Sequence, residues 1–118
     1  MIKLEEIDFH DKVVLNVKFE SNNDFLDSIS IIVLDKNKKY LIECNNCVKV
    51  VFNGNGWITG RDSIRELSYK QGEKILDEIP SFVPEQIKEQ FIYLYLNFNV
   101  SNSELKIIAQ KIYFREIL

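Results

Sequence analysis

The sequence predicts a mainly-β fold, an antiparallel curved sheet or half-barrel with one or two short helices, with an α+β fold as the alternative. Apolar and polar residues alternate along much of the chain, which is the period of a strand with one buried face. Clusters of Asn, Asp, Gly and Ser separate these runs, as the turns of antiparallel hairpins require. With 118 residues, 46% hydrophobic and 28% charged, we expect a single soluble domain spanning residues 1–118.

The first half of the chain has the pattern of strands joined by turns. Four runs show it: Val13–Phe19, Ser28–Leu34, Tyr40–Glu43 and Val48–Phe52. Asn45-Asn46 separates the last two runs and predicts a hairpin turn, because Asn tolerates positive φ. Asn53-Gly54-Asn55-Gly56 ends the series with a second strong turn signal, after which Trp57–Thr59 would resume the pairing.

The middle of the chain is less regular. Residues 62–69 fit either a capped helix or a strand, and the pattern does not choose between them. Glu73–Ile79 has helical spacing of its apolar residues. Pro84 could open another helical turn, with Ile87 and Phe91 on one side. We therefore expect the short helices here.

The last third is rich in residues that favour strands. Ile92–Val100 alternates between an aliphatic face and a face of Tyr and Asn. Beyond Ser103 the apolar parity changes near Gln110, which predicts a strand with a β-bulge there. A helix over 103–117 is the competing interpretation, and the strand is favoured.

The charge balance limits the classes of partner. The net charge is −3 and the pI about 5.2, which argues against an electrostatic nucleic-acid binder but suits a basic protein partner. The opening Met1–Glu6 carries acids where a signal peptide needs bases, and no apolar run approaches a membrane span. We expect a cytoplasmic protein without membrane contact, either a monomer or a small homo-oligomer.

Cys44 and Cys47 form the only cysteine pair. A structural zinc site needs four ligands, and His10 is the only histidine. A redox pair needs its first Cys at a helix start, whereas strand patterns flank both residues here. We expect two reduced structural thiols, with no metal and no cofactor.

Phe9-His10-Asp11 offers the one candidate for acid–base chemistry. His10 could act as a general base oriented by Asp11, but no nucleophile motif, phosphate-binding glycine loop or metal-ligand pair accompanies it. The other interpretation is a histidine that hydrogen-bonds to backbone at a strand entrance. We predict that the protein is not an enzyme.

Two features are candidates for partner contact. Trp57 and Arg61, in a glycine-rich turn, belong to the residue types enriched at interface hot spots. Acidic residues gather in the irregular middle, where they could face a basic partner. The predicted partner-binding residues are Trp57, Arg61, Asp62, Glu73, Asp77, Glu78, Glu85 and Glu89. Alternatively, Trp57 covers the core and the acids are a solvated surface.

The triplet Phe9-His10-Asp11 before the strand 12–19 resembles the opening of small bacterial immunity-protein families of polymorphic toxin systems. The resemblance extends through Cys47–Val50 and residues 62–64 to the final pair of strands. It implies a mainly antiparallel β domain that binds and blocks a cognate toxin without catalysis. The acidic residues would suit a toxin with a basic nuclease domain. It supplies no residue-by-residue contact positions.

A small-molecule-binding or sensory domain is the second hypothesis. Tyr93, Tyr95, Tyr113 and Phe114 could line a concave sheet face that holds a ligand.

Overall fold

The structure is a computed structural model that describes residues 8–21, 27–54, 62–100 and 102–117. Its elements in these ranges are β1 (Val13–Ser21), β2 (Asp27–Asp35), β3 (Lys38–Asn53), β4 (Asp62–Gln71), η2 (Gly72–Glu78), η3 (Glu85–Gln90), β5 (Ile92–Phe98) and β6 (Glu104–Glu116). The predicted mainly-β class is confirmed. Both helices are short and of the 3-10 type.

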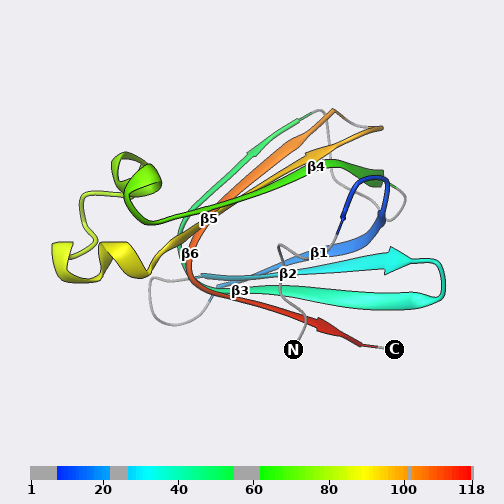
Figure 1. The fold of residues 1–118 in the computed structure, drawn as a ribbon, viewed down its shortest axis with the longest axis horizontal. Coiled ribbons are helices and arrows are strands. Elements are labelled where there is room, and N and C mark those ends of the chain that lie inside the picture. The colour runs from blue at the N-terminus through cyan, green and yellow to red at the C-terminus, as the bar shows by residue number, and fades with distance from the viewer. Residues whose placement is uncertain (1–7, 22–26, 55–61, 101, 118) are drawn as a thin grey trace.

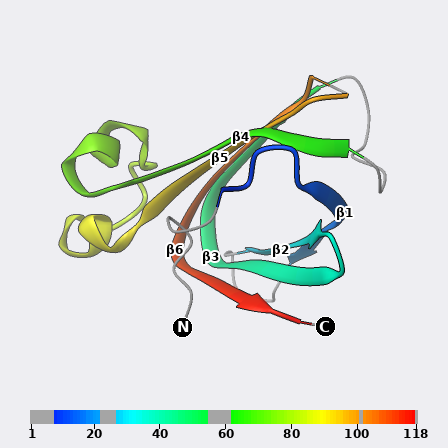
Figure 2. The same cartoon turned by 45° about the vertical axis from the view of Figure 1, so that its right-hand side comes forward.

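The strands form one antiparallel sheet that closes into a ring in the order β1-β2-β3-β6-β5-β4 (Figures 1 and 2). The closure is uneven. β3 and β6 pair from Tyr40 to Asn53, whereas β1 and β4 share only the pairs Val13–Ser63 and Val14–Asp62 in the part of the chain that the structure describes. The molecule is therefore a sheet bent into a ring and not a true barrel.

The long strands β3 and β6 each begin in one layer of the molecule and end in the other (Figure 1). At the bend, Asn46 has a φ of 56° and its Nδ2 donates a hydrogen bond of 3.0 Å to Oε1 of Gln110 on β6. The hairpin predicted at Asn45-Asn46 is wrong, because positive φ at one residue bends β3 without reversing it. Cys44 and Cys47, on either side of the bend, are both buried.

The predicted strand after Ser103 is confirmed as β6, but the predicted bulge near Gln110 is misplaced. The β3–β6 register shifts between Cys47 and Lys49, so the extra residue belongs to β3. Around Gln110 the pairing of β3 with β6 is regular, because Tyr40–Cys47 pairs with Ala109–Glu116 without a register shift. We attribute the change of apolar parity near Gln110 to the bend that β6 shares with β3.

Residues 62–69, which the sequence left undecided, form most of β4. Its register against β5 shifts between Ile64 and Glu66. This shift lets Ile64, Leu67 and Tyr69 all turn toward the inside of the ring, where Ile64 is buried and the other two are half-buried. Inward packing of apolar residues thus selects the strand over the helix.

The main core, which we call the inner core, fills the ring. Its members come from every strand: Phe9, Val14, Ile29, Ile31, Val33, Tyr40, Ile42, Cys44, Cys47, Ile64, Leu94, Leu96, Phe98, Leu105, Ile107, Ala109 and Phe114. Phe114 meets Phe9 edge-on, with ring centroids 5.5 Å apart, and stacks on Tyr40 at 5.3 Å. These contacts tie the segment before β1 to the end of β6.

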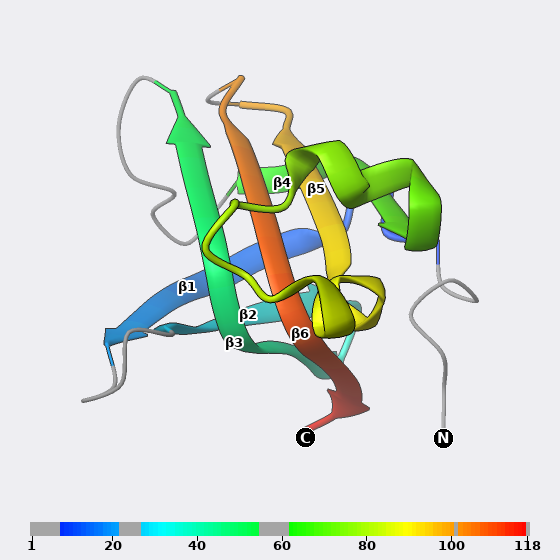
Figure 3. The same ribbon diagram turned by 90° about the vertical axis from the view of Figure 1, so that its left-hand side faces the viewer.

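A second, smaller core lies outside the ring, where η2 and η3 pack against β5 and β6 (Figure 3). We call the segment 72–90 the cap. Its core consists of Ile75, Ile79, Val83, Phe91 and Ile108. The expected short helices are confirmed, and Ile87 and Phe91 do lie together, because both pack into this cap core.

Candidate interaction surface

The outer face of β4, β5 and β6 carries two tyrosines side by side. On β5, Leu94 and Leu96 are buried in the inner core, so strand alternation turns Tyr93 and Tyr95 outward. Across the sheet, Tyr95 lies between Ser68 and Lys106 in the strand registers. The tyrosines therefore stand on a rigid sheet whose neighbouring strands hold them in place.

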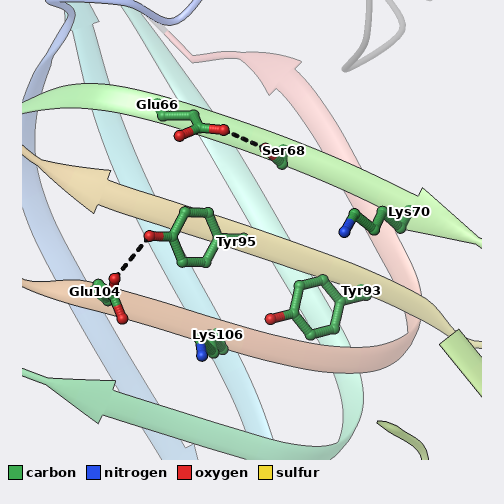
Figure 4. A pocket seen from close by; sticks show the side chains of 7 residues that line it. All are labelled: Glu66, Ser68, Lys70, Tyr93, Tyr95, Glu104 and Lys106. Atoms are coloured by element: carbon green, nitrogen blue, oxygen red, sulfur yellow. Dashed lines mark hydrogen bonds between the residues drawn. The ribbon is translucent and has the colours of Figure 1, made fainter. Parts of the chain in front are cut away.

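These two rings form the floor of a surface hollow of about 320 Å³ (Figure 4). We call its lining residues the tyrosine face: Glu66, Ser68, Lys70, Tyr93, Tyr95, Glu104 and Lys106. Glu66 and Glu104 lie at one end, Lys106 lies beside Tyr95, and Lys70 lies toward the other end (Figure 4). The hollow thus combines aromatic surface with both signs of charge.

Hydrogen bonds hold the polar groups of this face in place. The hydroxyl of Tyr95 donates to Oε1 of Glu104 at 2.9 Å, and the hydroxyl of Ser68 donates to Oε1 of Glu66 at 2.9 Å. Burial, with the nearby Glu104 charge, raises the pKa of both Tyr93 and Tyr95 above the ordinary value of 10.0. The phenols are therefore neutral at physiological pH and act as hydrogen-bond donors.

The cap borders the tyrosine face. Tyr93 packs against the cap core, and after burial the charge of Glu78 is the largest influence raising the pKa of Tyr93. Glu78 and Asp77 on η2, and Glu85 and Glu89 on η3, are exposed. Lys88 pairs with Glu85 at 2.7 Å, so one cap charge is locally compensated. Among the described cap side chains, carboxylates therefore outnumber lysines, and the charge of Glu78 is the one that acts on Tyr93.

The predicted partner-binding residues separate into three groups. Trp57 and Arg61 lie outside the described residues, and the Glu73 side chain is not described although its backbone belongs to η2. Asp62 is buried, with a relative exposure of 5%, and its Oδ1 accepts hydrogen bonds from the backbone N–H groups of Ser63 and Val100. The remaining four, Asp77, Glu78, Glu85 and Glu89, are exposed on η2 and η3, which contact each other.

The aromatic set predicted for a concave face is divided among different sites. Phe114 is in the inner core, and Tyr113 is exposed on the outer face of the other layer, beside Leu41 and Arg115. Consecutive strand residues point to opposite faces, so the pair 113–114 could not share one. Tyr93 and Tyr95 lie together, but on the outer face, because apolar side chains of the inner core occupy the concave side.

His10 and Asp11 lie at the seam between β1 and β4. Nδ1 of His10 is 3.1 Å from Oδ2 of Asp11, and both side chains are largely exposed. Asn99 donates from Nδ2 to Asp11 at 3.1 Å and to the Ser63 hydroxyl at 2.8 Å. The backbone N–H of Asp11 also donates to the Ile64 carbonyl at 2.7 Å. These contacts give the triplet a structural part in closing the ring.

The two cysteines are buried in the inner core. The Sγ of Cys47 donates to the Cys44 carbonyl at 3.5 Å, and burial raises the pKa of the Cys44 thiol far above its ordinary value. A thiol held protonated in this way is a poor nucleophile and metal ligand. Both cysteines are reduced thiols, and no cluster of His, Cys, Asp and Glu suited to a metal occurs among the described residues.

The charged members of the tyrosine face were missed from the sequence. Glu66, Lys70, Glu104 and Lys106 come from β4 and β6, and the cross-strand register brings them to the tyrosines of β5. A signal existed in the alternation of Ile92–Val100, which separates the tyrosines from the aliphatic face. It could not identify their neighbours without the strand order.

No known protein-family model matches this sequence, and no curated protein matches it significantly. Across the residues described here, no helix is long and apolar enough to span a membrane.

Proposed function

We propose that this chain is a cytoplasmic, immunity-type protein that binds a partner toxin and neutralises it by direct contact, without catalysis. The observation that carries the proposal is the tyrosine face, two half-buried tyrosines on a rigid sheet beside an acidic cap. The resemblance of Phe9-His10-Asp11 and the following strand to immunity proteins supplies the toxin as the partner.

Tyrosines suit a protein contact for a physical reason. Each offers a large apolar ring with only two rotatable side-chain bonds, so little conformational entropy is lost on binding. Here the hydroxyl of Tyr95 is already bonded to Glu104 and the side chain of Tyr93 already packs against the cap core, which lowers that cost further. The neutral hydroxyl of Tyr93 can donate a hydrogen bond to a backbone carbonyl of a partner, and the hydroxyl oxygen of Tyr95, whose proton is donated to Glu104, can accept one.

Electrostatics favours a basic partner. The net charge of the chain is −3, and the cap presents Asp77, Glu78, Glu85 and Glu89 with Lys88 paired to one of them. Opposite charges across an interface mainly accelerate encounter and select the partner. A nuclease domain with a phosphate-binding cleft has the required charge, and the cap acids would occupy the place of phosphate groups.

The first experiment identifies the partner. Immunity genes stand next to their toxin genes, so the toxin-like domain encoded beside this gene is expressed and titrated with the purified chain by calorimetry. We expect a one-to-one complex and survival of cells that co-express the two proteins. A neighbouring toxin domain that neither binds nor is neutralised would refute the proposal.

The second experiment locates the contact. Tyr95→Ala should weaken binding at least about tenfold, equivalent to about 1.4 kcal/mol, since aromatic anchors dominate interface energies. The matched control is Tyr113→Ala, which removes an exposed tyrosine from the other layer and should leave the affinity unchanged. Equal losses in both variants, or a loss only at Tyr113, would place the contact elsewhere.

A further inference from the structure

The side chains of the tyrosine face are arranged in rows that cross the three strands. Glu66 of β4 and Glu104 of β6 both lie opposite Asn97 of β5, and we call this end of the hollow the glutamate end. The next row consists of Ser68, Tyr95 and Lys106. Adjacent strands lie about 4.8 Å apart, so the backbones of the two glutamates are roughly 10 Å apart. The hollow therefore has one carboxylate on each side of β5 (Figure 4).

Both carboxylates of the glutamate end are held by hydrogen bonds. Oε1 of Glu104 accepts from the hydroxyl of Tyr95, and Oε1 of Glu66 accepts from the hydroxyl of Ser68, each at 2.9 Å. A carboxylate has two oxygens that can each accept more than one hydrogen bond, so both glutamates can accept further donors. After burial, the hydrogen bond and charge of Glu104 and then the charge of Glu66 raise the pKa of Tyr95. Both carboxylates therefore lie within electrostatic reach of this tyrosine.

We propose that the glutamate end of the tyrosine face binds a guanidinium group, stacked on the ring of Tyr95 with its N–H groups directed to Glu66 and Glu104. A guanidinium is planar, carries its donors in a rigid fork and stacks on aromatic rings. The hydroxyl oxygen of Tyr95, whose proton is donated to Glu104, can accept one of these N–H groups. In the complex, the guanidinium is an arginine side chain of the toxin, and this source rests on the proposed function.

Arginine suits this arrangement better than lysine does. A guanidinium has donors on two sides, so it can bridge carboxylates that approach from opposite sides of β5. An ammonium is a compact and strongly hydrated point charge, and it gains less from stacking on a ring. The hollow should therefore discriminate between two side chains of equal charge.

The lysines of the face determine which end of the hollow takes the cation. Lys106 is in register with Tyr95, and Lys70 is in register with Tyr93, so neither lies in the row of the two glutamates. Both charges repel a cation and direct it to the glutamate end. Removal of the charge of Lys106 should therefore strengthen guanidinium binding, whereas it would weaken the binding of an anion.

The direct test uses the free chain and needs no toxin. The isotope-labelled chain is titrated with N-acetyl-arginine amide, whose only charge is that of the side chain, and the backbone amide shifts are followed by NMR. We expect saturable shifts around Tyr95 on β4, β5 and β6. N-acetyl-lysine amide, with the same charge, should bind about two- to fivefold more weakly.

Four variants assign the binding to these side chains. Glu66→Gln and Glu104→Gln keep the size of the side chain, and each should weaken binding of the arginine probe about two- to fivefold, as for an exposed ion pair. Lys106→Gln should strengthen binding by a similar factor. Glu43→Gln is the matched control, because it removes a carboxylate beside exposed Tyr113 in the hollow of the other layer. It should leave the affinity for the probe unchanged.

The inference is overturned if no saturable shifts occur around Tyr95, if the two probes bind equally, or if Glu43→Gln weakens binding as much as Glu66→Gln does. Weaker binding in Lys106→Gln would also overturn it, because an anionic ligand gives that result. Glu66 is exposed, so Glu66→Gln keeps the test valid even if Glu104→Gln unfolds the chain.

Toxin binding is measured separately with the neighbouring toxin domain. The double variant Glu66→Gln with Glu104→Gln should weaken the complex about tenfold or more, because it leaves a charge at the interface without its partners. Equal toxin affinities of the wild type and the double variant would overturn the arginine contact and leave the proposed function standing. Binding of the arginine probe without binding of the toxin domain would support the guanidinium site and refute the proposed function.

Discussion

The inner core and the cap core are built from the same kinds of residue but hold the molecule in different ways. Every strand contributes to the inner core, so its loss affects the whole ring. The cap core joins one local segment, 72–90, and Phe91 to the outer side of β6 through Ile108. Adjacent residues of β6 make the division plain, because Ile107 belongs to the inner core and Ile108 to the cap core.

This difference separates stability from recognition. The strand order of the ring places β4, β5 and β6 side by side and so assembles the tyrosine face. The cap packs next to Tyr93 and contributes exposed carboxylates. Small, locally connected units open more readily than a core shared by all strands. We therefore expect changes in the inner core to affect global unfolding, and changes in the cap to affect mainly the surface it forms.

The sharpest way to break the comparison is to truncate the two neighbours on β6. Ile107→Ala should lower the free energy of unfolding by about 2–5 kcal/mol, as for a fully buried core residue. Ile108→Ala should cost less, because the cap can detach while the ring stays folded. Denaturant unfolding measures both, and an equal or larger loss at Ile108 would show that the cap is integral to the ring.

Loss of the buried carboxylate of Asp62 should likewise lower the free energy of unfolding more than loss of an exposed carboxylate of the cap. Asp62→Ala leaves the backbone N–H groups of Ser63 and Val100 without their carboxylate acceptor and should cost about 1–3 kcal/mol. Glu85→Ala removes an exposed ion pair with Lys88 and should change stability by less than about 0.5 kcal/mol. Thermal unfolding of the two variants checks this. Comparable stability of both would contradict the structural assignment of Asp62.

Substitution of one glycine in the ring and one in the cap extends the comparison to the backbone. A Cβ on Gly54 would lie 2.5 Å from Cβ and 3.1 Å from Cα of buried Ser103, so Gly54→Ala should destabilise by about 1–3 kcal/mol through crowding. Gly72, at the start of the cap, has a φ of +81° and open space around it. Gly72→Ala should cost only the strain of positive φ, about 1 kcal/mol. Chemical denaturation should rank the two in this order, and the reverse order would count against the packing at Gly54.

The smallest expected effect is in the alkaline limb of the stability curve. Folding raises the pKa of Tyr93 and Tyr95, so the folded chain holds these protons more tightly than the unfolded chain does. Their contribution to stability is complete below pH 10.0, the unfolded value, and decreases as the pH rises above it. Tyr95→Phe should make that decrease shallower in denaturant midpoints measured against pH. An unchanged slope would mean that the Tyr95–Glu104 contact does not persist in solution.

The sequence was sufficient for the fold class and for most strands, because alternation records which residues face the core. It failed at Asn45-Asn46, where positive φ was compatible with a hairpin turn and with a bend. The pairing of β3 with β6 decided between the two, and that pairing joins residues far apart in the chain. The same limit applies to the bulge. The change of apolar parity occurs at Gln110 on β6, whereas the extra residue that shifts the register is Val48 on β3.

The candidate site was less accessible to sequence reasoning. Grouping the acids by their position in the chain placed Asp62 with Glu78, although the first is buried at the seam and the second is exposed on the cap. Alternation along Ile92–Val100 places Tyr93 and Tyr95 on one face of the strand, but it does not show whether that face is concave, because alternation does not encode the direction in which a sheet curves. Strand order, and hence the charges of Lys106 and Glu66 beside Tyr95, came only with the three-dimensional structure.

Amide hydrogen exchange of the free chain and of its complex with the neighbouring toxin domain tests the proposed contact most directly. If the tyrosine face and cap form the contact, exchange should slow in β4, β5 and η2 on binding, and should be unchanged in β1 and β2. Slowing confined to β1 and β2, or no slowing in a complex shown by mass to have formed, would contradict the assignment of the tyrosine face as the toxin-binding surface.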